Sequence, residues 1–221
     1  SLDSAISSEM SGTELAEAKA WLSGNQAKGA AAALHNASSG WGTDEAKIMS
    51  TLQGMSPDDY LKVRAEFAKT SGQSLGGMFK DELSGGELKA AESALASKFG
   101  TGLGSKDVDD LSKKSPTLMK NLDALADQGW VIEYGKPGDI TATDTGAKRI
   151  IVNPAEKGIT TELMQTLSHE SGHALYDPGY TPHDGLKKNE YVEANLNRQL
   201  AGEGEATIMN LRVRDEIMKA K

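Results

Sequence analysis

The chain has 221 residues, of which 38% are hydrophobic and 25% charged, as expected for a soluble globular protein of one large or two small domains. Its net charge of −8 argues against nucleic acid as a partner, because phosphate contacts need a basic face. There is no transmembrane run, signal-peptide pattern or cysteine, so membrane spans, disulfides and thiolate metal ligands are not expected.

Residues 1–100 are rich in Ala, Gly and Ser and show helical periodicity with few strand-forming residues. Ser56 and Pro57 form a typical helix start, and Thr43 is expected to cap the helix that begins at Asp44. The pattern predicts short helices over 12–22, 25–36, 43–53, 57–70, 74–83 and 86–98.

The segment Gly40-Trp41-Gly42-Thr43-Asp44, together with Glu82-Leu83-Ser84-Gly85, resembles one annexin repeat. The resemblance implies an all-α domain and a Ca²⁺ site with hard oxygen ligands. Its ligands would be the carbonyls of Ser38, Gly40 and Gly42 and the carboxylate of Glu82. Trp41 at the loop tip would then touch a lipid headgroup region. Because annexins carry four repeats and this chain has room for one, calcium-dependent membrane contact is expected to be weak.

A glycine-rich segment near residues 99–105 is the expected linker between two domains, 1–100 and 105–221. The second domain is predicted to contain helices over 115–128, 160–176 and 189–219. Strands are predicted over 130–134 and 149–152. The expected fold class is therefore α+β and mostly helical, with an all-α annexin-like N-terminal domain. The C-terminal domain is expected to be small and zincin-like, with a short sheet and an H-E-x-x-H helix.

The pattern His169-Glu170-Ser171-Gly172-His173 lies late in the helix predicted over 160–176. Histidines four residues apart share one helix face, so both imidazoles can bind one metal ion. Glu170 between them can act as the general base toward a zinc-activated water. Gly172 leaves room for an adjacent element. This pattern predicts a zinc hydrolase site.

Without cysteine, the third zinc ligand should be a downstream carboxylate. The candidates are Asp177, Asp184, Glu190, Glu193, Glu203, Glu205 and Asp215. At 100° per residue, Glu203 shares an apolar stripe with Leu196 and Leu200, which is expected to face the core. A carboxylate on such a stripe needs a partner, and a metal ion provides one. Glu205, the second choice, projects from the opposite side.

Glu203-Gly204-Glu205-Ala206 resembles the E-G-x-A element that follows H-E-x-x-H in gluzincin metallopeptidases. In that family the first Glu is the third zinc ligand, which implies this role for Glu203. The sequence from Glu190 to Leu211 is also similar to metallopeptidase domains of bacterial secreted toxins and effectors, type VI secretion-like ones included. In gluzincins a strand near the site binds extended substrate by edge pairing, a role expected here of Arg149–Val152.

The leading hypothesis is a zinc endopeptidase with a protein or peptide substrate, delivered by a bacterium into a target cell. A secretion apparatus or an immunity or chaperone protein would be a further partner. Tyr180, His183 and Tyr191 are the candidates for a transition-state stabiliser. One alternative is hydrolysis of the peptide crosslinks of peptidoglycan. The other is a calcium-dependent membrane-binding protein with an inactive metal site.

Overall fold

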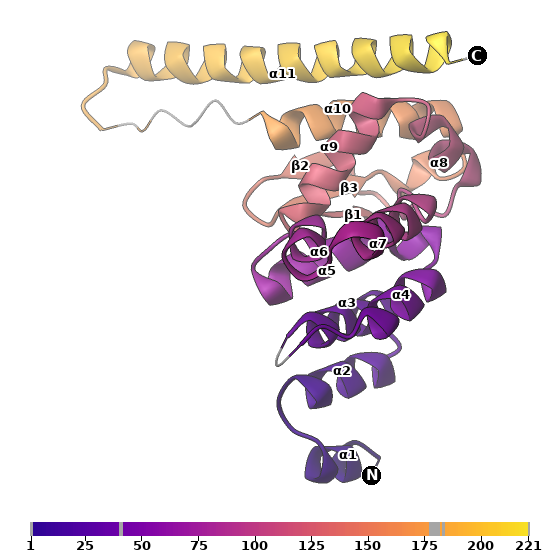
Figure 1. The fold of residues 1–221 in the computed structure, drawn as a ribbon. Coiled ribbons are helices and arrows are strands. Elements are labelled where there is room, and N and C mark those ends of the chain that lie inside the picture. The colour runs from indigo at the N-terminus through magenta and orange to yellow at the C-terminus, as the bar shows by residue number, and fades with distance from the viewer. Residues whose placement is uncertain (1, 40–41, 177–181, 183, 221) are drawn as a thin grey trace. The chain divides into compact units, whose positions relative to one another are not determined.

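The computed structural model describes residues 2–39, 42–176, 182 and 184–220. It is mostly helical with one small sheet (Figure 1). Contacts divide the chain into two compact units, of which the first comprises 1–106 with 123–132 and the second 107–122 with 133–221. None of the described helices is long and apolar enough to cross a lipid bilayer.

The first unit contains seven consecutive α-helices and one 3-10 turn. They are α1 (Leu2–Glu9), α2 (Gly12–Leu22), α3 (Gln26–Ser38), α4 (Glu45–Gly54), η1 (Pro57–Asp59), α5 (Tyr60–Ser71), α6 (Leu75–Glu82) and α7 (Gly85–Ser97). The six predicted helices of this half are confirmed, with every end within two residues of the prediction except the start of α5, where Pro57–Asp59 form the 3-10 turn η1. Helix α1 was not predicted, because its eight residues carry no clear apolar periodicity.

The core of the first unit forms around α3, which packs against α2, α4 and α5. Leu34 of α3, Leu52 of α4 and Phe67 of α5 are fully buried. Most other buried positions of α3 are alanines, whose small side chains let the neighbouring helices approach closely. This packing explains why an alanine-rich sequence with few aromatic residues still forms a core.

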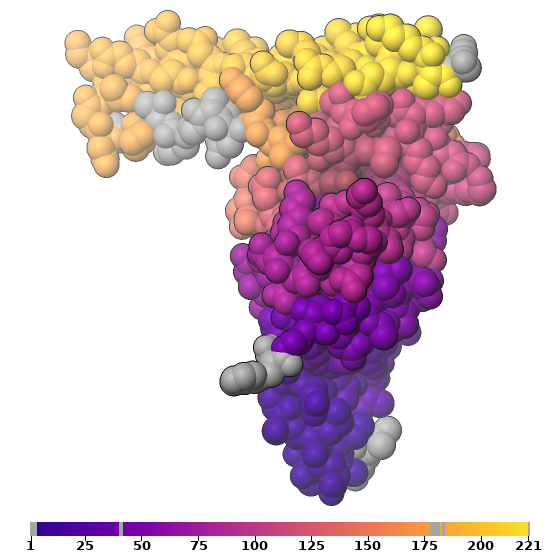
Figure 2. Space-filling model, in the orientation of Figure 1, coloured from indigo at the N-terminus to yellow at the C-terminus, as the bar shows by residue number. Residues whose placement is uncertain are grey.

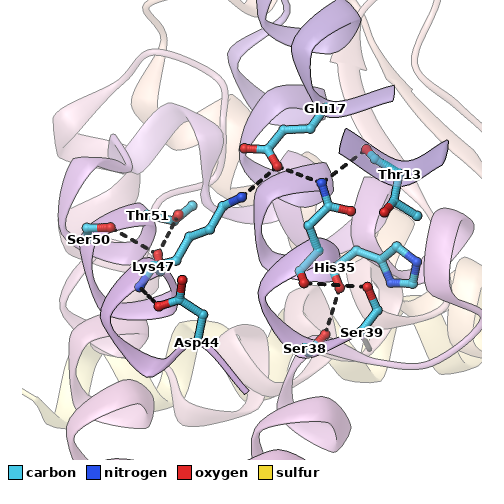
Figure 3. A network of polar contacts seen from close by, with 10 residues as sticks. Thr13, Glu17, His35, Ser38, Ser39, Asp44, Lys47, Ser50 and Thr51 are labelled. Carbon is cyan, nitrogen blue, oxygen red and sulfur yellow. Dashed lines mark hydrogen bonds and ion pairs between the residues drawn. The ribbon is translucent and has the colours of Figure 1, made fainter. Parts of the chain in front are cut away.

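A polar network joins α2, α3 and α4 at one side of this core (Figure 3). The carboxylate of Glu17 accepts hydrogen bonds from Lys47 at 2.7 Å and from Asn36 at 2.6 Å. The amide of Asn36 also donates to the carbonyl of Thr13 at 3.0 Å. Burial raises the pKa of Glu17, but the donors from Lys47 and Asn36 outweigh it, so the pKa lies below its usual range.

Arg64 of α5 is the centre of a second, buried network, in which its side chain is only 7% exposed. Its guanidinium donates to Asp127 at 2.8 Å and to the hydroxyl of Tyr60 at 3.1 Å, and Asp123 lies 3.9 Å away. Burial raises the pKa of Asp123 and of Asp127, although Arg64 opposes the shift. Both acids belong to α9 (Pro116–Asp127), so the network holds the end of this helix to α5.

The sheet contains three short strands in the order β1-β3-β2. Their bounds are β1 (Val131–Tyr134), β2 (Ala142–Asp144) and β3 (Arg149–Val152). The pairing of β2 with β3 is antiparallel, with Thr143 opposite Ile150. The sequence predicted β1 and β3. It did not predict β2, because three residues flanked by glycines and acids carry too short an alternation to read.

The remaining elements are α8 (Lys106–Ser112), η2 (Pro154–Glu156), α10 (Thr160–Leu175) and α11 (Lys188–Lys219). Of these, α10 and α11 are the two longest helices that the structure describes. Helix α11 packs along α10, as Figure 1 shows. With 32 residues against 16, α11 is too long for α10 to cover. Most side chains of α11, orange to yellow in Figure 2, are therefore exposed.

Candidate metal centre

The two histidines of the H-E-x-x-H pattern lie one turn apart on α10. Leu163 and Leu167 bury one face of this helix, and His169 and His173 are half-buried on another. Their Nε2 atoms are 3.1 Å apart, with the ring planes nearly perpendicular. The two imidazole nitrogens are thus close enough to bind the same metal ion.

Glu203 of α11 meets both imidazoles with its carboxylate. Its Oε2 lies 3.5 Å from Nε2 of His169, and its Oε1 lies 3.5 Å from Nε2 of His173. Among the residues that the structure describes, these three form the single group of His, Asp and Glu side chains placed to share a metal ion. Glu205 is exposed and is not in this group.

The spacing of the three donor atoms fits a zinc ion. Zinc ligands lie about 2.0–2.2 Å from the metal, so two ligands at a tetrahedral angle are about 3.3 Å apart. The separations here, 3.1 Å between the nitrogens and 3.5 Å from each nitrogen to a carboxylate oxygen, lie on either side of that value. Two imidazoles and one carboxylate also form a typical donor set of catalytic zinc sites, which keep a fourth position open.

Gly172 determines how closely α11 can approach α10. A Cβ atom at Gly172 would lie 2.7 Å from the Cα atom of Ala206, which is closer than real Cβ contacts. The glycine inside the motif therefore gives the predicted room to an adjacent element, and that element is α11. The glycines beside Glu203 differ: a Cβ at Gly202 would meet His173 Nδ1 at 3.8 Å, whereas Gly204 faces open space.

Glu170, the predicted general base, is held by a residue that the sequence did not single out. Its side chain is only 9% exposed, and its Oε2 accepts a hydrogen bond from the hydroxyl of Thr143 at 2.7 Å. No hydrogen bond from a described residue reaches Oε1 of Glu170. A threonine in a three-residue strand, distant in sequence from the motif, carries no local signal of this role.

The three donor atoms and Glu170 open into one cavity of about 630 Å³. Thr143 of β2 and the threonines that flank this strand, Thr141 and Thr145, form one wall. The remaining lining residues come from the end of α10 and from α11, namely Tyr176, Leu196, Arg198, Gln199, Leu200 and Gly202. The cavity therefore combines a polar strand wall with a helix wall in which Leu196 and Leu200 lie beside polar residues such as Arg198.

The apolar stripe of α11 is exposed, whereas the sequence predicted that it faces the core. Leu196 is 51% exposed and Leu200 is 60% exposed, and the Glu203 side chain on the same stripe is 63% exposed. Both leucines line the cavity beside the metal centre. Periodicity correctly placed these residues on one face, but the face borders the cavity, since α10 is too short to cover it.

The strand expected to bind substrate by edge pairing is also different. Arg149–Val152 forms β3, which lies between β1 and β2 and has neither edge free. The edge strand beside Glu170 is β2, as the bond from Thr143 shows. Ala142–Asp144, rather than Arg149–Val152, is therefore the strand at the edge of the sheet near Glu170.

The three candidates for a transition-state stabiliser are not brought to the cavity by described contacts. Tyr180 and His183 lie outside the described residues. Tyr191 is half-buried on α11 but does not line the cavity. Polar side chains that do line it are Tyr176 and Arg198, which sequence reasoning missed because nothing local distinguishes them.

The expected calcium loop of the first unit is described in part. Ser38 is the last residue of α3, whereas Gly40 and Trp41 lie outside the described residues. Gly42 has a φ of +99°, a backbone conformation that glycine adopts more easily than residues with a Cβ atom. Glu82 is exposed at the end of α6.

A hydrogen bond brings Glu82 to this loop. The hydroxyl of Thr43 donates to Oε2 of Glu82 at 2.7 Å, across about forty residues of sequence. Thr43 does not cap α4 as predicted; Asp44 does, accepting from the amide of Lys47 at 2.9 Å. The carboxylate expected to bind calcium therefore lies next to the glycine loop, as the annexin resemblance implies.

Comparison with known proteins gives one match. The annexin family model matches residues 29–91, a segment that begins in α3 and ends in α7. No curated protein and no solved structure matches the chain. The region 29–91 is thus an annexin-like helical repeat, and annexins bind calcium.

Proposed function

We propose that the chain is a zinc-dependent metallopeptidase with His169, His173 and Glu203 as metal ligands and Glu170 as general base. One observation carries the proposal. Three donor atoms with the spacing of a tetrahedral zinc site share a cavity with a buried carboxylate that has one oxygen unbonded. A cluster of acids and histidines that lies together by chance on the surface would not need a buried carboxylate beside it.

The roles of the residues follow from their positions. Zinc, when bound, supplies a Lewis acid that polarises the scissile carbonyl and lowers the pKa of water toward about 7. Thr143 holds Oε2 of Glu170, so Oε1 is the atom that accepts the proton of the attacking water. The same oxygen then returns the proton to the leaving amine. Burial of Glu170 excludes bulk water, which would otherwise compete for that proton.

An extended peptide is the substrate form that this cavity suits. The free edge of β2 offers backbone donors and acceptors to a strand-like substrate, and the threonine wall lies along it. Leu196 and Leu200 form an apolar wall for side chains of the substrate. The proposed reaction is therefore cleavage within a peptide rather than hydrolysis of a small ester.

Two variants test the proposal. Glu170→Gln should keep one zinc ion per chain but lower peptide hydrolysis by about 10²- to 10⁴-fold, because only the proton transfer is removed. His169→Ala should lose both the metal and the activity. Metal analysis of the purified chain and mass spectrometry of a digested peptide library measure the two quantities. A wild-type chain without zinc at neutral pH would exclude the proposal.

Delivery into a target cell as a bacterial effector extends this proposal and rests on the toxin resemblance. Expression of wild-type and Glu170→Gln chains in bacterial cytosol, bacterial periplasm and eukaryotic cells tests it. Toxicity of the wild type in eukaryotic cells alone favours a host protein substrate. Toxicity in the periplasm alone favours the alternative substrate, the peptide crosslinks of peptidoglycan.

Calcium-dependent membrane contact is a second function, proposed for the annexin-like repeat. The family match over 29–91 and the position of Glu82 beside Thr43 support it. A single exposed site would bind calcium in the millimolar range, as extracellular modules do. Vesicles of anionic lipid, sedimented with the chain with and without millimolar Ca²⁺, test this function. Sedimentation that does not depend on calcium contradicts it.

A further inference from the structure

Arg198 of α11 is a cation in the metal-centre cavity that pairs with no carboxylate of the described residues. It lines the cavity together with His169, Glu170 and Glu203. Its Nε is buried and makes no hydrogen bond, and no ion pair joins the guanidinium to any carboxylate of the described residues. A guanidinium presents five donors in a fixed planar fork, and leaving such donors unbonded in a partly buried place is costly.

Both carboxylates of the cavity are otherwise engaged. Glu203 faces the two imidazoles, and Glu170 accepts from Thr143. Arg198 therefore neutralises neither of these two carboxylates. Arg64, Arg149 and Arg214 differ, because each pairs with a carboxylate.

We infer that Arg198 is a subsite for a carboxylate of the peptide substrate. A planar fork matches a carboxylate with two parallel hydrogen bonds, which a neutral amide cannot equal. The inference rests on the proposed peptidase function, because it describes the substrate of that same cavity. The carboxylate is either the free C-terminus of a peptide or the side chain of Asp or Glu.

The position of Arg198 on the helix sets the distance of this carboxylate from the scissile bond. Arg198 precedes the ligand Glu203 by five residues, which is about 7.5 Å along a helix axis. One extended peptide residue spans about 3.3–3.6 Å. Since five residues also turn about 140° around the axis, Arg198 flanks the metal ligand, and we place the carboxylate a few residues from the bond that is cleaved.

A second cavity disfavours an anionic group of the substrate. This cavity, of about 360 Å³, adjoins the first at Thr141, His169 and Glu170. It is lined by the acids Glu156 and Glu162 and by no described lysine or arginine. An anionic group of the substrate is repelled there and attracted by Arg198, so the two cavities give the peptide one orientation.

The test compares four acetylated model pentapeptides with Leu at the centre. The first ends in a free carboxylate, the second ends in an amide, and the third and fourth are amides with Glu or Gln in the fourth position. The wild type should cleave the first or the third about 10- to 100-fold more efficiently, in kcat/KM, than its neutral counterpart. Preference for the first assigns the subsite to a free C-terminus, and preference for the third assigns it to an acidic side chain.

Variants show whether Arg198 causes the preference. Arg198→Gln should abolish the preference between each charged peptide and its neutral counterpart, and Arg198→Lys should keep only part of it. The matched control is Arg214→Gln, which removes an exposed arginine of the same helix whose partner is Asp215. A wild type that cleaves charged and neutral peptides equally, or a preference that survives Arg198→Gln, overturns the inference.

Binding measurements separate this inference from the proposed function. Calorimetry with the zinc-loaded Glu170→Gln chain measures the affinity for the same four peptides without any hydrolysis. A charge preference in binding that Arg198→Gln removes supports the subsite even if the wild type cleaves none of the peptides. Absence of any charge preference in both binding and cleavage overturns the subsite and leaves the zinc peptidase proposal intact.

Discussion

Arg64 and Glu170 are both buried charged side chains, one in each unit of the chain, and their surroundings are opposite. Arg64 is 7% exposed and has Asp127, Asp123 and Tyr60 around it. Glu170 is 9% exposed, yet one bond from Thr143 is all that the described residues donate to its carboxylate. The first charge is paired with carboxylates of the protein itself, whereas the second lines a cavity.

The difference separates a structural charge from a chemical one. A buried ion must be paired and hydrogen-bonded, because otherwise the free-energy cost of desolvating it destabilises the fold. The first unit pairs Arg64 with its own acids. The second unit pairs Glu170 with one hydroxyl donor, and under the proposed function a metal ion and a substrate would take up the remaining groups of the cavity. Five experiments test this comparison.

Replacement of Arg64 should have the largest effect on stability. Arg64→Met leaves Asp127 and Asp123 buried without their counter-charge, and removing one partner of a buried pair costs about 3–5 kcal/mol. Thermal unfolding followed by circular dichroism measures the loss. Arg214→Met, at an exposed pair, should change stability by no more than about 0.5 kcal/mol. Equal effects of the two variants would remove the structural role of the buried network.

Loss of Glu203 should have the largest effect on metal binding. Glu203→Ala removes one of three proposed protein ligands. Residues that only orient a ligand change metal affinity by about 10- to 100-fold, so zinc affinity should fall by more than this. Glu205→Ala is the matched control on the same helix and should leave the affinity unchanged. Competition with a chromogenic chelator measures both. A larger effect of Glu205→Ala would reassign the third ligand.

A side chain at Gly172 should separate the two helices that hold the ligands. Gly172→Val places its Cβ against the backbone of Ala206, and overpacking of this kind costs about 1–3 kcal/mol. Zinc affinity should fall with it, because Glu203 moves away from the histidines. Gly204→Ala faces open space and should instead stabilise α11 by up to about 1 kcal/mol. Unchanged zinc affinity in Gly172→Val would show that the close approach is not needed.

Thr143 should act on turnover rather than on substrate binding. Thr143→Val keeps the shape but removes the donor to Glu170, so kcat should fall about 10-fold with little change in KM. Thr143→Ser keeps a hydroxyl and should restore most of kcat. Steady-state kinetics on one model peptide separate the two constants. Failure of serine to rescue would mean that Thr143 serves only the packing of β2.

Removal of Glu82 should give the smallest effect, because the loop site is exposed. Calorimetry with millimolar Ca²⁺ should show weak heat for the wild type that Glu82→Ala abolishes. Glu87→Ala, another exposed acid of this region, is the control and should keep the heat. Heat that persists in Glu82→Ala would leave the annexin-like repeat as a helical packing module.

The sequence predicted most helices of the chain, because their signals are local. Helix α2 has the predicted ends, and α10 and α11 differ from their predicted ends by one residue. Strand β2 and helix α8 were missed, since three and seven residues are too few to establish a period. With β2, the position of Thr143 was missed too.

Long-range packing decided what covers each face. The apolar stripe with Leu196 and Leu200 was predicted as core from its phase, but it borders a cavity. Periodicity shows which residues share a face, not which element lies against it. The sequence also could not predict that Arg198 pairs with no described carboxylate, because an ion pair depends on every neighbour in space.

The residues alone determined that His169 and His173 share a helix face with Glu170 between them, since a spacing of four is fixed by the pitch of the helix. They also placed Glu203 on the right side of its own helix. Only the tertiary structure decided that Glu203 meets those histidines, because that depends on α11 closing onto Gly172. It also decided that Thr143 holds Glu170, a contact between a strand and a helix that no local pattern encodes.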